Sequence, residues 1–404
     1  MEQQIRAWLR YSIVLGLYVS PTEATPYIHN SNHCPANTSA LRGERQMWLK
    51  QRQAFQRERL KRIYLRLLMP LLCVLYVNGL LRRKPVPGTM LSWTVATIFF
   101  SSQALSNFLL AGEALWRQQE HETLLRLLHE IELSLKLRLR QDVRLDWLLP
   151  RVRWLLRYLL WTSVLFFVLF VYNFVELQYI GYFWYSIWFA IAMRLRLIQL
   201  LIYVRVLQHY LECLSMKLSQ LVAYRVAPSR QLMDVNYARL QSLEYLVAIK
   251  EIYDLLFKAF QQLNDFAGWS LFSIILCYML DYGCTLYWSL LSWEGYLERR
   301  NYYIACFWWL LPMSLITWHI CHLCHSCRQL DRVIASMLCR MIIKRSSKSL
   351  RSYRILLQQF STQLQLQQIE VSAKRFFTLD MRLIMSICTA IATYLVIIIQ
   401  FLRI

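Results

Sequence analysis

The sequence predicts an all-α membrane protein with seven transmembrane helices, a cytoplasmic N-terminus and a cytoplasmic anchor bundle. Hydrophobic residue types make up 57% of the 404 residues and charged residues only 17%, against about 25% in a typical soluble protein. Nine Gly and nine Pro exclude collagen-like and glycine- or proline-rich disordered chains. The excess of apolar residues is too large for one water-soluble core, so we expect a membrane to cover it.

Seven apolar segments are long enough to cross roughly 30 Å of hydrocarbon as helices. Their approximate bounds are 62–81, 90–112, 154–175, 177–193, 266–289, 302–323 and 382–402. They divide the chain into an N-terminal segment (1–61), six spans with their polar extensions (62–323), an anchor helix region (324–381), and a last span with the C-terminus (382–404). An odd number of spans places the two termini on opposite sides of the membrane.

The Lys and Arg residues indicate the orientation. With the N-terminus inside, 38 of those outside the spans face the cytoplasm and six face the exterior. Cytoplasmic loops are enriched in Lys and Arg, so this distribution favours an inside N-terminus. The net charge of +22 does not predict nucleic-acid binding, because the cations lie between apolar runs and suit anionic membrane lipids.

The first residues allow a second interpretation of the topology. Ser12–Val19 is apolar, follows two Arg and precedes Pro21, an outline that is also typical of a cleaved signal peptide. Cleavage would place the glycosylation sequon at Asn37 on the outside. The alternative is a short amphipathic segment at the inner face of the membrane, anchored by Trp8 and Tyr11.

Amphipathic segments on the cytoplasmic side predict the anchor bundle. Apolar residues recur at helical spacing over 237–262 and lead into the fifth span without a break, so one helix should run from the cytoplasm into the membrane. The fourth span continues in the same way past Arg194 and Arg196, and residues 350–377 repeat the pattern before the last span. These apolar faces need partners, so we expect them to pack together and to bind other copies.

Enzyme chemistry finds little support in the sequence. His121 and Glu122 resemble the start of a zinc-protease helix, but Leu125 stands where the second His ligand is needed. Neither a nucleophile elbow nor a P-loop is present, and no cofactor is expected. The segment from His319 to Cys327 contains three His and three Cys. It could supply two metal ligands from one helix face, it could be acylated, or it could simply pack between helices.

Aromatic residues in the outer halves of the fourth to sixth spans suggest a ligand site. An interfacial aromatic belt is the alternative explanation. However, Trp184, Trp188 and Trp308 lie below the rim, and aromatic walls suit a small, partly apolar ligand. Asp281 lies well inside a predicted span, where a carboxylate costs at least about 2.5 kcal/mol. It should face a cavity or a hydrogen-bond partner, such as a neighbouring Tyr or the backbone. With Tyr282, these residues are the candidate ligand-binding set.

The last span carries the most specific motif. Residues 393–401, Thr-Tyr-Leu-Val-Ile-Ile-Ile-Gln-Phe, match without a gap the T-Y-five-hydrophobic-Q-F signature of insect gustatory receptors, with Thr393, Tyr394, Gln400 and Phe401 as the fixed positions. Residues upstream, from 364 onward, also resemble the carboxyl region of that family. The resemblance is detailed over 364–404 and agrees with the span count over the rest.

This resemblance implies a tastant-gated, non-selective cation channel in the plasma membrane of sensory dendrites. Members of the family assemble as homo- or hetero-tetramers through the anchor bundle, build the pore from the seventh helix, and bind a small-molecule tastant in the outer half of the helical bundle. Sugar-sensing branches often have an acidic residue after the motif Tyr. Leu395 occupies that position here, which favours bitter or other non-sugar ligands.

The spacing within the motif places a candidate gate. Ile397, Gln400 and Phe401 fall at i, i+3 and i+4 and share one helix face. Four copies of Ile397 would form an apolar ring that excludes water and ions, and Gln400 could hydrate a passing cation. The alternative is a lipid-facing helix with a terminal Gln that reaches the interface.

Two rival classes remain. A G-protein-coupled-type receptor needs an outside N-terminus, which the distribution of Lys and Arg opposes. A secondary transporter should show an internal repeat with interrupted helices, and the sequence contains no recognisable repeat.

Overall fold

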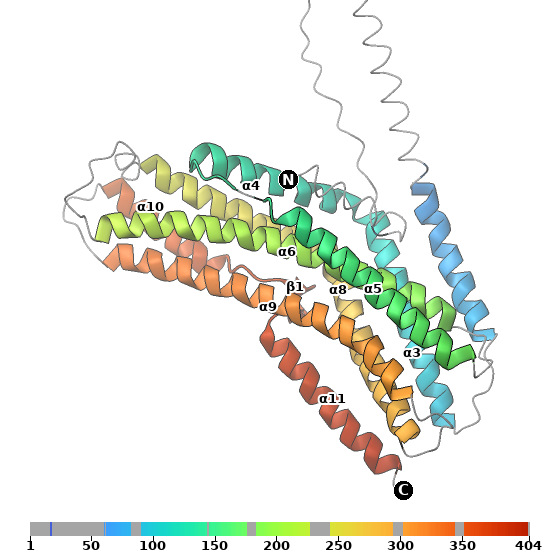
Figure 1. Ribbon diagram of the computed structural model, residues 1–404. Helices are drawn as coiled ribbons and strands as arrows, with labels where there is room; N and C mark the ends of the chain where they lie inside the picture. The colour runs from blue at the N-terminus through green and yellow to red at the C-terminus, as the bar shows by residue number, and fades with distance from the viewer. Residues whose placement is uncertain are drawn as a thin grey trace, which may run out of the picture.

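The computed structural model describes residues 17, 60, 62–81, 90–143, 145–175, 183–226, 243–293, 302–343 and 351–402. An unlabelled helix, Arg62–Leu81, comes first. The labelled helices are α3 (Met90–Trp116), α4 (Gln118–Arg138), α5 (Leu148–Val175), α6 (Phe183–Val226), α8 (Leu243–Trp293), α9 (Tyr302–Ile343), α10 (Arg351–Leu366) and α11 (Met381–Leu402). Two short strands, β1 (Ser372–Ala373) and β2 (Phe377–Thr378), lie between α10 and α11. Figure 1 shows that long helices form almost the whole molecule and that α11 descends at its edge.

Three helices are much longer than a membrane is thick. α6 has 44 residues, α8 has 51 and α9 has 42. At 1.5 Å per residue, α8 is about 77 Å long, more than twice the hydrocarbon thickness. The prediction that the fourth and fifth spans continue as unbroken helices is confirmed, except that residues 237–242 lie outside the described part of the chain.

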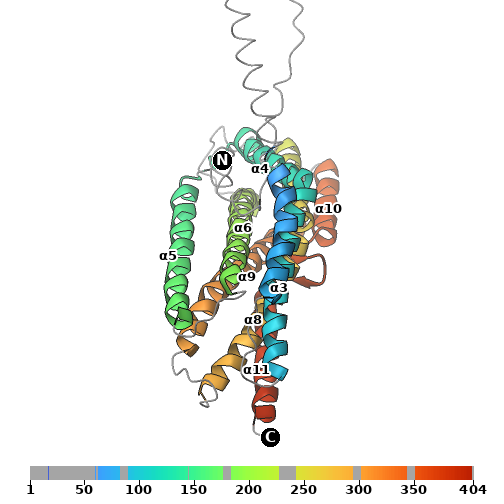
Figure 2. The same cartoon turned by 90° about the vertical axis from the view of Figure 1, so that its right-hand side faces the viewer.

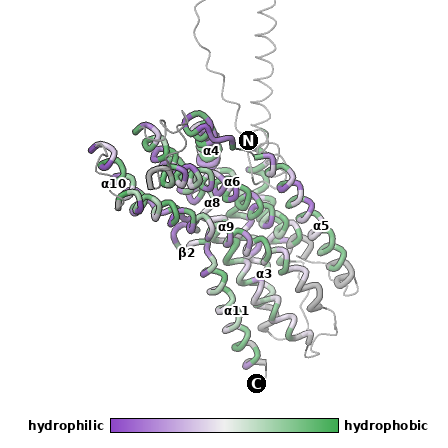
Figure 3. The backbone as a smooth tube through the Cα atoms, turned by 60° about the vertical axis from the view of Figure 1, so that its left-hand side comes forward, coloured by the Kyte–Doolittle hydropathy of each residue, from purple (hydrophilic) through white to green (hydrophobic). Residues whose placement is uncertain are grey.

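Apolar surface on the outer helices identifies a multi-pass membrane protein. Five described helices are long and apolar enough to cross a membrane, and Met381–Ile397 is a shorter apolar helix. Leu67, Leu160 and Trp161 are each more than 60% exposed, which is far more apolar surface than water tolerates in a monomer. Figure 3 shows hydrophobic residues along α5 and α11. Because this finding does not fix seven crossings or the side of the N-terminus, both stay predictions.

The core is most tightly packed at the end of the molecule away from α11. We call this part the anchor bundle: α4, α10, residues 205–226 of α6, 243–263 of α8 and 324–343 of α9. Its apolar stripes interlock, so that Leu128 and Ile131 of α4, Leu207 of α6 and Ile252 and Leu256 of α8 are completely buried. Figure 2 shows α4, α10 and the ends of the long helices gathered together at this end.

The helix expected over 350–377 ends earlier than its apolar pattern suggests. α10 stops at Leu366, and β1 and β2 pair as an antiparallel hairpin, so the helical prediction is wrong beyond that residue. The physical reason is tertiary. Side chains of α8 and α9 bind the backbone of this segment: Asn264 Oδ1 accepts from the Ser372 N–H at 2.9 Å, and Asp331 Oδ2 accepts from the Ile369 N–H at 3.5 Å. Helix propensity is a weak preference that such contacts override.

Candidate functional site

A small cavity lies between α6, α8 and α9. Its lining residues are Ala190, Met193, Arg194, Tyr278, Asp281, Trp309, Leu310 and Met313. The space in which a water molecule can be centred is ≈ 10 Å³, about what one water needs. The cavity combines apolar and aromatic walls with one carboxylate and one guanidinium, which is the composition expected of a small-molecule site.

Asp281 is held by the neighbouring helix α3. Its carboxylate is buried and accepts hydrogen bonds from Gln103 Nε2, at 3.2 Å to Oδ2 and 3.4 Å to Oδ1, and from the Cys277 thiol at 3.9 Å. The side chain of Gln103 is fully buried, and its Oε1 atom has no hydrogen-bond partner in the described part of the chain. The hydrogen bonds to Asp281 therefore come from an amide and a thiol rather than from the Tyr hydroxyl or backbone considered from the sequence.

Arg194 is a charged residue of this cavity that the sequence analysis did not assign to the ligand site. It is buried, its Nη2 donates to the Trp309 carbonyl at 3.0 Å, and its guanidinium carbon lies 5.5 Å from the centroid of the Trp309 ring. An Arg within the apolar run of the fourth span was the sequence signal for this contact.

The structure separates the candidate ligand-binding residues. Tyr282 packs beside the cavity against Phe166 and Trp309. Trp188 packs in a different cluster, against residues of the helix Arg62–Leu81 and of α3. Trp308 is half-buried, whereas its neighbour Trp309 lines the cavity.

One candidate residue is not placed. The side chain of Trp184 lies outside the described residues. Asp281 and Tyr282 are thus the two candidates that the structure places at or beside the cavity.

The motif helix α11 is lightly packed. Tyr394 and Ile397 are 46% and 42% exposed, Thr393 and Gln400 are also exposed, and the side chain of Phe401 lies outside the described residues. The Thr393 hydroxyl donates to the Thr389 carbonyl at 3.0 Å, so it is satisfied within its own helix. Within the described part of the chain, the face of α11 that carries Ile397 and Gln400 is left largely exposed.

The Tyr394 ring rests on a glycine of α8. A Cβ atom added at Gly283 would lie 2.9 Å from Tyr394 Cε1, closer than real Cβ contacts allow. Gly283 is two residues after Asp281. One turn of α8 therefore touches both the cavity and α11.

Comparison with known proteins decides the family. The model of the 7tm chemosensory receptor family matches residues 5–402. The chain is a 7tm chemosensory receptor. The resemblance to insect gustatory receptors that the last span suggested is confirmed.

Two fruit-fly proteins are similar to this receptor in sequence. Putative gustatory receptor 39b of Drosophila melanogaster is 27% identical over 220 residues, 54% of this chain and 59% of that protein. Gustatory receptor 23a of the same species is 29% identical over 163 residues, 38% of this chain and 40% of that protein. The receptor therefore aligns with less than two thirds of the length of each.

Solved structures share the fold. The insect olfactory receptor OR5 from Machilis hrabei in complex with eugenol has a TM-score of 0.64 and 13% identity, with 99% of each chain covered. The same receptor described without that ligand has a TM-score of 0.63 and 12% identity. At these identities the comparison shows the arrangement of helices alone.

A second buried acid–base pair lies where the receptor's α3 continues into α4. Arg196 Nη2 and Glu113 Oε2 are 3.2 Å apart, and both side chains are almost completely buried. Arg196 also donates to Ser270 Oγ at 3.2 Å and to Gln199 Oε1 at 2.9 Å. Glu113 Oε1 accepts from the Trp269 N–H at 2.8 Å. Charges at this depth need such a set of partners.

His121 extends this network into the anchor bundle. Its ring stacks on Phe266 with centroids 4.2 Å apart, and the Arg196 guanidinium carbon lies 4.3 Å from the centroid of the same Phe266 ring. His121 Nε2 is 2.5 Å from the Tyr203 hydroxyl. Burial, and then the charge of Arg196, lower the pKa of His121 well below its ordinary 6.5, so the ring is neutral at physiological pH.

The His and Cys residues between 319 and 327 divide by side-chain burial. Cys321, Cys324 and Cys327 belong to the core, whereas His322 is exposed. Within the described ranges, no three His, Cys, Asp or Glu side chains come together as metal ligands. The three thiols pack between helices, the third of the interpretations considered from the sequence.

Proposed function

We propose that this receptor is a tastant-gated, non-selective cation channel, assembled from four subunits with α11 of each lining a central pore. The observation that carries the proposal is the exposure of Ile397 and Gln400 on a helix that bears the family motif. A Gln amide exposed at membrane depth is unfavourable against lipid, whereas it is favourable against water or another subunit. The neighbouring subunits would be copies of this chain or other gustatory receptors.

The ligand site of the proposal is the cavity at Asp281. A ligand with a hydrogen-bond donor or a cationic nitrogen would bind the carboxylate, and its apolar part would pack on Trp309. Since the cavity admits about one water, ligand entry requires neighbouring side chains to move. Met193 and Met313 are suited to this because methionine is unbranched and flexible. Leu395 after the motif Tyr favours bitter or other non-sugar ligands by family resemblance.

The orientation of the proposal puts the N-terminus and the anchor bundle in the cytoplasm of a sensory dendrite. It follows from the 38 to 6 distribution of Lys and Arg. In this orientation the cavity lies in the outer half of the bundle and the Glu113–Arg196 pair lies toward the cytoplasm.

Recording current from the purified receptor in planar bilayers tests the proposal. A compound screen should find ligands that evoke cation current without a G protein or a counter-substrate, which a G-protein-coupled receptor or a transporter would need. Ile397→Ser should make the closed apolar ring wettable and produce ligand-independent current, and Gln400→Ala should alter conductance or permeability ratios. If both variants reach the surface and conduct like the wild type, α11 is not the pore helix.

A further inference from the structure

The hairpin between α10 and α11 joins the anchor bundle to the motif helix. Its strands pair Ser372 with Thr378 and Ala373 with Phe377, and the Leu379 N–H donates to the Val371 carbonyl at 2.8 Å. Strands of two residues are not stable alone in water. The position of this hairpin is therefore set by what it packs against.

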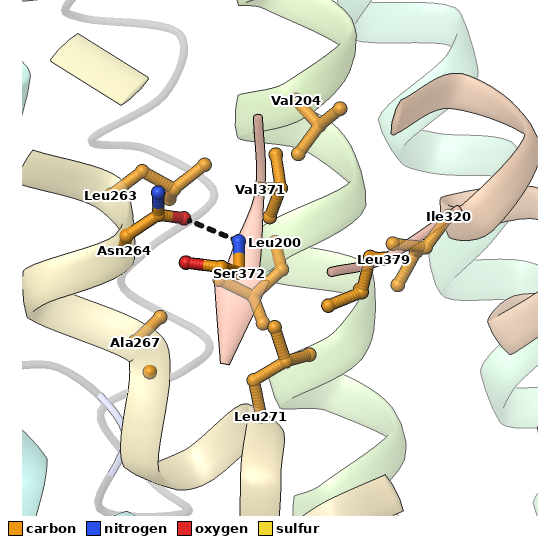
Figure 4. Close-up of a pocket in the computed structure, with 11 residues that line it drawn as sticks. Leu200, Val204, Leu263, Asn264, Ala267, Leu271, Ile320, Val371, Ser372 and Leu379 are labelled. Carbon is orange, nitrogen blue, oxygen red and sulfur yellow. Dashed lines mark hydrogen bonds between the residues drawn. The ribbon is translucent and has the colours of Figure 1, made fainter. Parts of the chain in front are cut away.

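One side chain of α8 holds the hairpin by its backbone. Asn264 Nδ2 donates to the Glu370 carbonyl at 2.9 Å. Asn264 Oδ1 accepts from the Ser372 N–H at 2.9 Å, the hydrogen bond dashed in Figure 4. The amide thus uses both its donor and its acceptor on one short stretch of chain, as a neighbouring strand would. Ser372 is buried, so losing Asn264 would leave a buried N–H without this partner.

One turn further along α8, a glycine lets the hairpin come close. A Cβ atom added at Gly268 would lie 2.8 Å from Lys374 Cγ and 3.1 Å from the Lys374 backbone nitrogen. Lys374 also forms an ion pair with Asp265 at 3.4 Å. Its φ of 49°, followed by 64° at Arg375, forms the tight turn that brings the backbone against α8.

The apolar side of the hairpin closes over three helices. Val371 and Leu379 line a small cavity of ≈ 10 Å³ together with Leu200 of α6, Leu271 of α8 and Ile320 of α9. Figure 4 shows these side chains converging from the three helices beneath β1. A movement of α8 relative to α6 and α9 would therefore displace the hairpin.

α11 begins directly after the hairpin and is fixed at that end. Asp380 Oδ1 caps it by accepting from the N–H groups of Arg382 and Leu383, at 2.9 and 3.1 Å, and Asp380 Oδ2 lies 3.5 Å from Arg328 of α9. The motif residues farther along are exposed, as Ile397 illustrates. The helix is thus tied at one end and lightly packed at the other.

We propose that Asn264 is a positioning residue for gating, which clamps the hairpin to α8 and so sets where α11 begins. This inference rests on the proposed function, because it takes α11 as the pore helix. The cavity at Asp281 admits only about one water, so we take the described arrangement as the closed, ligand-free state. The bonds of Asn264 stabilise this state, so removing them frees α11 and makes opening without ligand more frequent.

The test combines hydrogen exchange with single-channel recording of the ligand-free receptor. Asn264→Ala should speed exchange of the Ser372 amide in lipid nanodiscs and raise the spontaneous open probability in planar bilayers. We expect about a tenfold rise, the size of one to two lost hydrogen bonds. Asn264→Asp keeps the acceptor for Ser372 but sets a carboxylate oxygen against the Glu370 carbonyl, which now lies 2.9 Å from the donor Nδ2. It should therefore also speed exchange and raise the open probability, as Asn264→Ala does.

A glycine pair supplies the matched control. Gly268→Ala pushes on the hairpin and should behave like Asn264→Ala. Gly112→Ala on α3 places its Cβ against the side chains of Trp116 and Met69, away from the hairpin, and should behave like the wild type. If openings of the wild type are too rare to count, the same variants can be recorded in the Ile397→Ser background, in which the basal current should be higher.

Each other outcome is decisive. Faster exchange with unchanged opening would reduce Asn264 to a structural role and overturn the inference. Unchanged exchange in Asn264→Ala would show that Asn264 does not hold the hairpin. Absence of current from both the wild type and Ile397→Ser would instead be failure of the proposed function, and the gating role would fall with it.

Discussion

Two arginines of α6, only two residues apart, occupy opposite kinds of buried site. Successive residues turn by about 100° on a helix, so Arg194 and Arg196 point to nearly opposite sides. Arg196 meets Glu113 at 3.2 Å and has further partners in Ser270 and Gln199. Arg194 and Asp281 instead line one cavity, with Arg194 donating to a backbone carbonyl and Asp281 accepting from Gln103. Similar charged groups stabilise the fold where they meet each other and, under the proposed function, bind a ligand where they do not.

Breaking the ion pair between Glu113 and Arg196 should have the largest effect, a loss of folding stability. Arg196→Met leaves the Glu113 carboxylate buried without its cation, which costs about 3–5 kcal/mol of folding free energy. The apparent midpoint of thermal unfolding in detergent should fall by several degrees. Adding Glu113→Leu should recover most of the loss, because the uncompensated charge is then gone.

A pair on the surface provides the control for this prediction. Arg138 and Glu251 form an ion pair with both side chains about half exposed, 52% and 51%, and such pairs contribute about 1 kcal/mol or less. Arg138→Met should therefore barely change the unfolding midpoint. Equal losses at Arg138 and Arg196 would contradict the distinction between the two sites.

Changing Arg194 or Asp281, which line the cavity, should affect the response to ligand more than the folding stability. Asp281→Asn removes the charge and keeps the shape, and Arg194→Met removes the cation from the other wall. Losing one buried contact with a ligand costs about 1–3 kcal/mol, which shifts the half-maximal concentration about 5- to 150-fold. Dose–response curves for compounds from the current screen give the measurement, with single-channel conductance unchanged.

Trp188→Ala extends the same experiment to the separate cluster in which Trp188 packs. A shift there would add this cluster to the ligand site. Normal dose responses in Asp281→Asn and Arg194→Met at normal surface expression would place the ligand elsewhere.

Acidification should lower the folding stability through His121, which extends the network of Glu113 and Arg196. Its pKa is lowered in the folded state, so the unfolded chain binds the proton more readily in the range from the ordinary 6.5 down to the folded value. Stability is then complete above pH 6.5 and falls as the pH decreases through that range. His121→Gln should flatten the fall of the unfolding midpoint between neutral and acid pH. An identical slope in the two proteins would remove His121 as the cause.

The smallest expected effect is none at all. The proposed orientation places both the Glu113–Arg196 pair and the N-terminal segment on the cytoplasmic side. Asn37 should then stay unglycosylated despite its sequon. The receptor from insect cells should therefore show no glycosidase-sensitive mass. A shift that disappears in Asn37→Gln would invert the orientation and bring back the signal-peptide interpretation.

Sequence periodicity predicted the helices better than the tertiary contacts between them. The apolar repeat along α8 correctly gave one helix from the anchor bundle into the span, because each repeat is a local property. The partner of Asp281 is Gln103, 178 residues away, and no local pattern connects them. The hairpin was missed for the same reason. The apolar spacing after Leu366 suits a helix, and side chains of other helices, among them Asn264 and Asp331, decide against it.

The contact between Gly283 and Tyr394 has an evolutionary consequence under the proposed function. Asp281 and Gly283 are about 3 Å apart along the helix axis and point to nearly opposite sides of it, so one turn of α8 touches the ligand cavity on one side and the pore helix on the other. A substitution that moves this turn alters what the receptor detects and how readily it opens at the same time. New taste preferences should therefore arise more freely through the cavity walls supplied by α6 and α9, while α8 changes slowly.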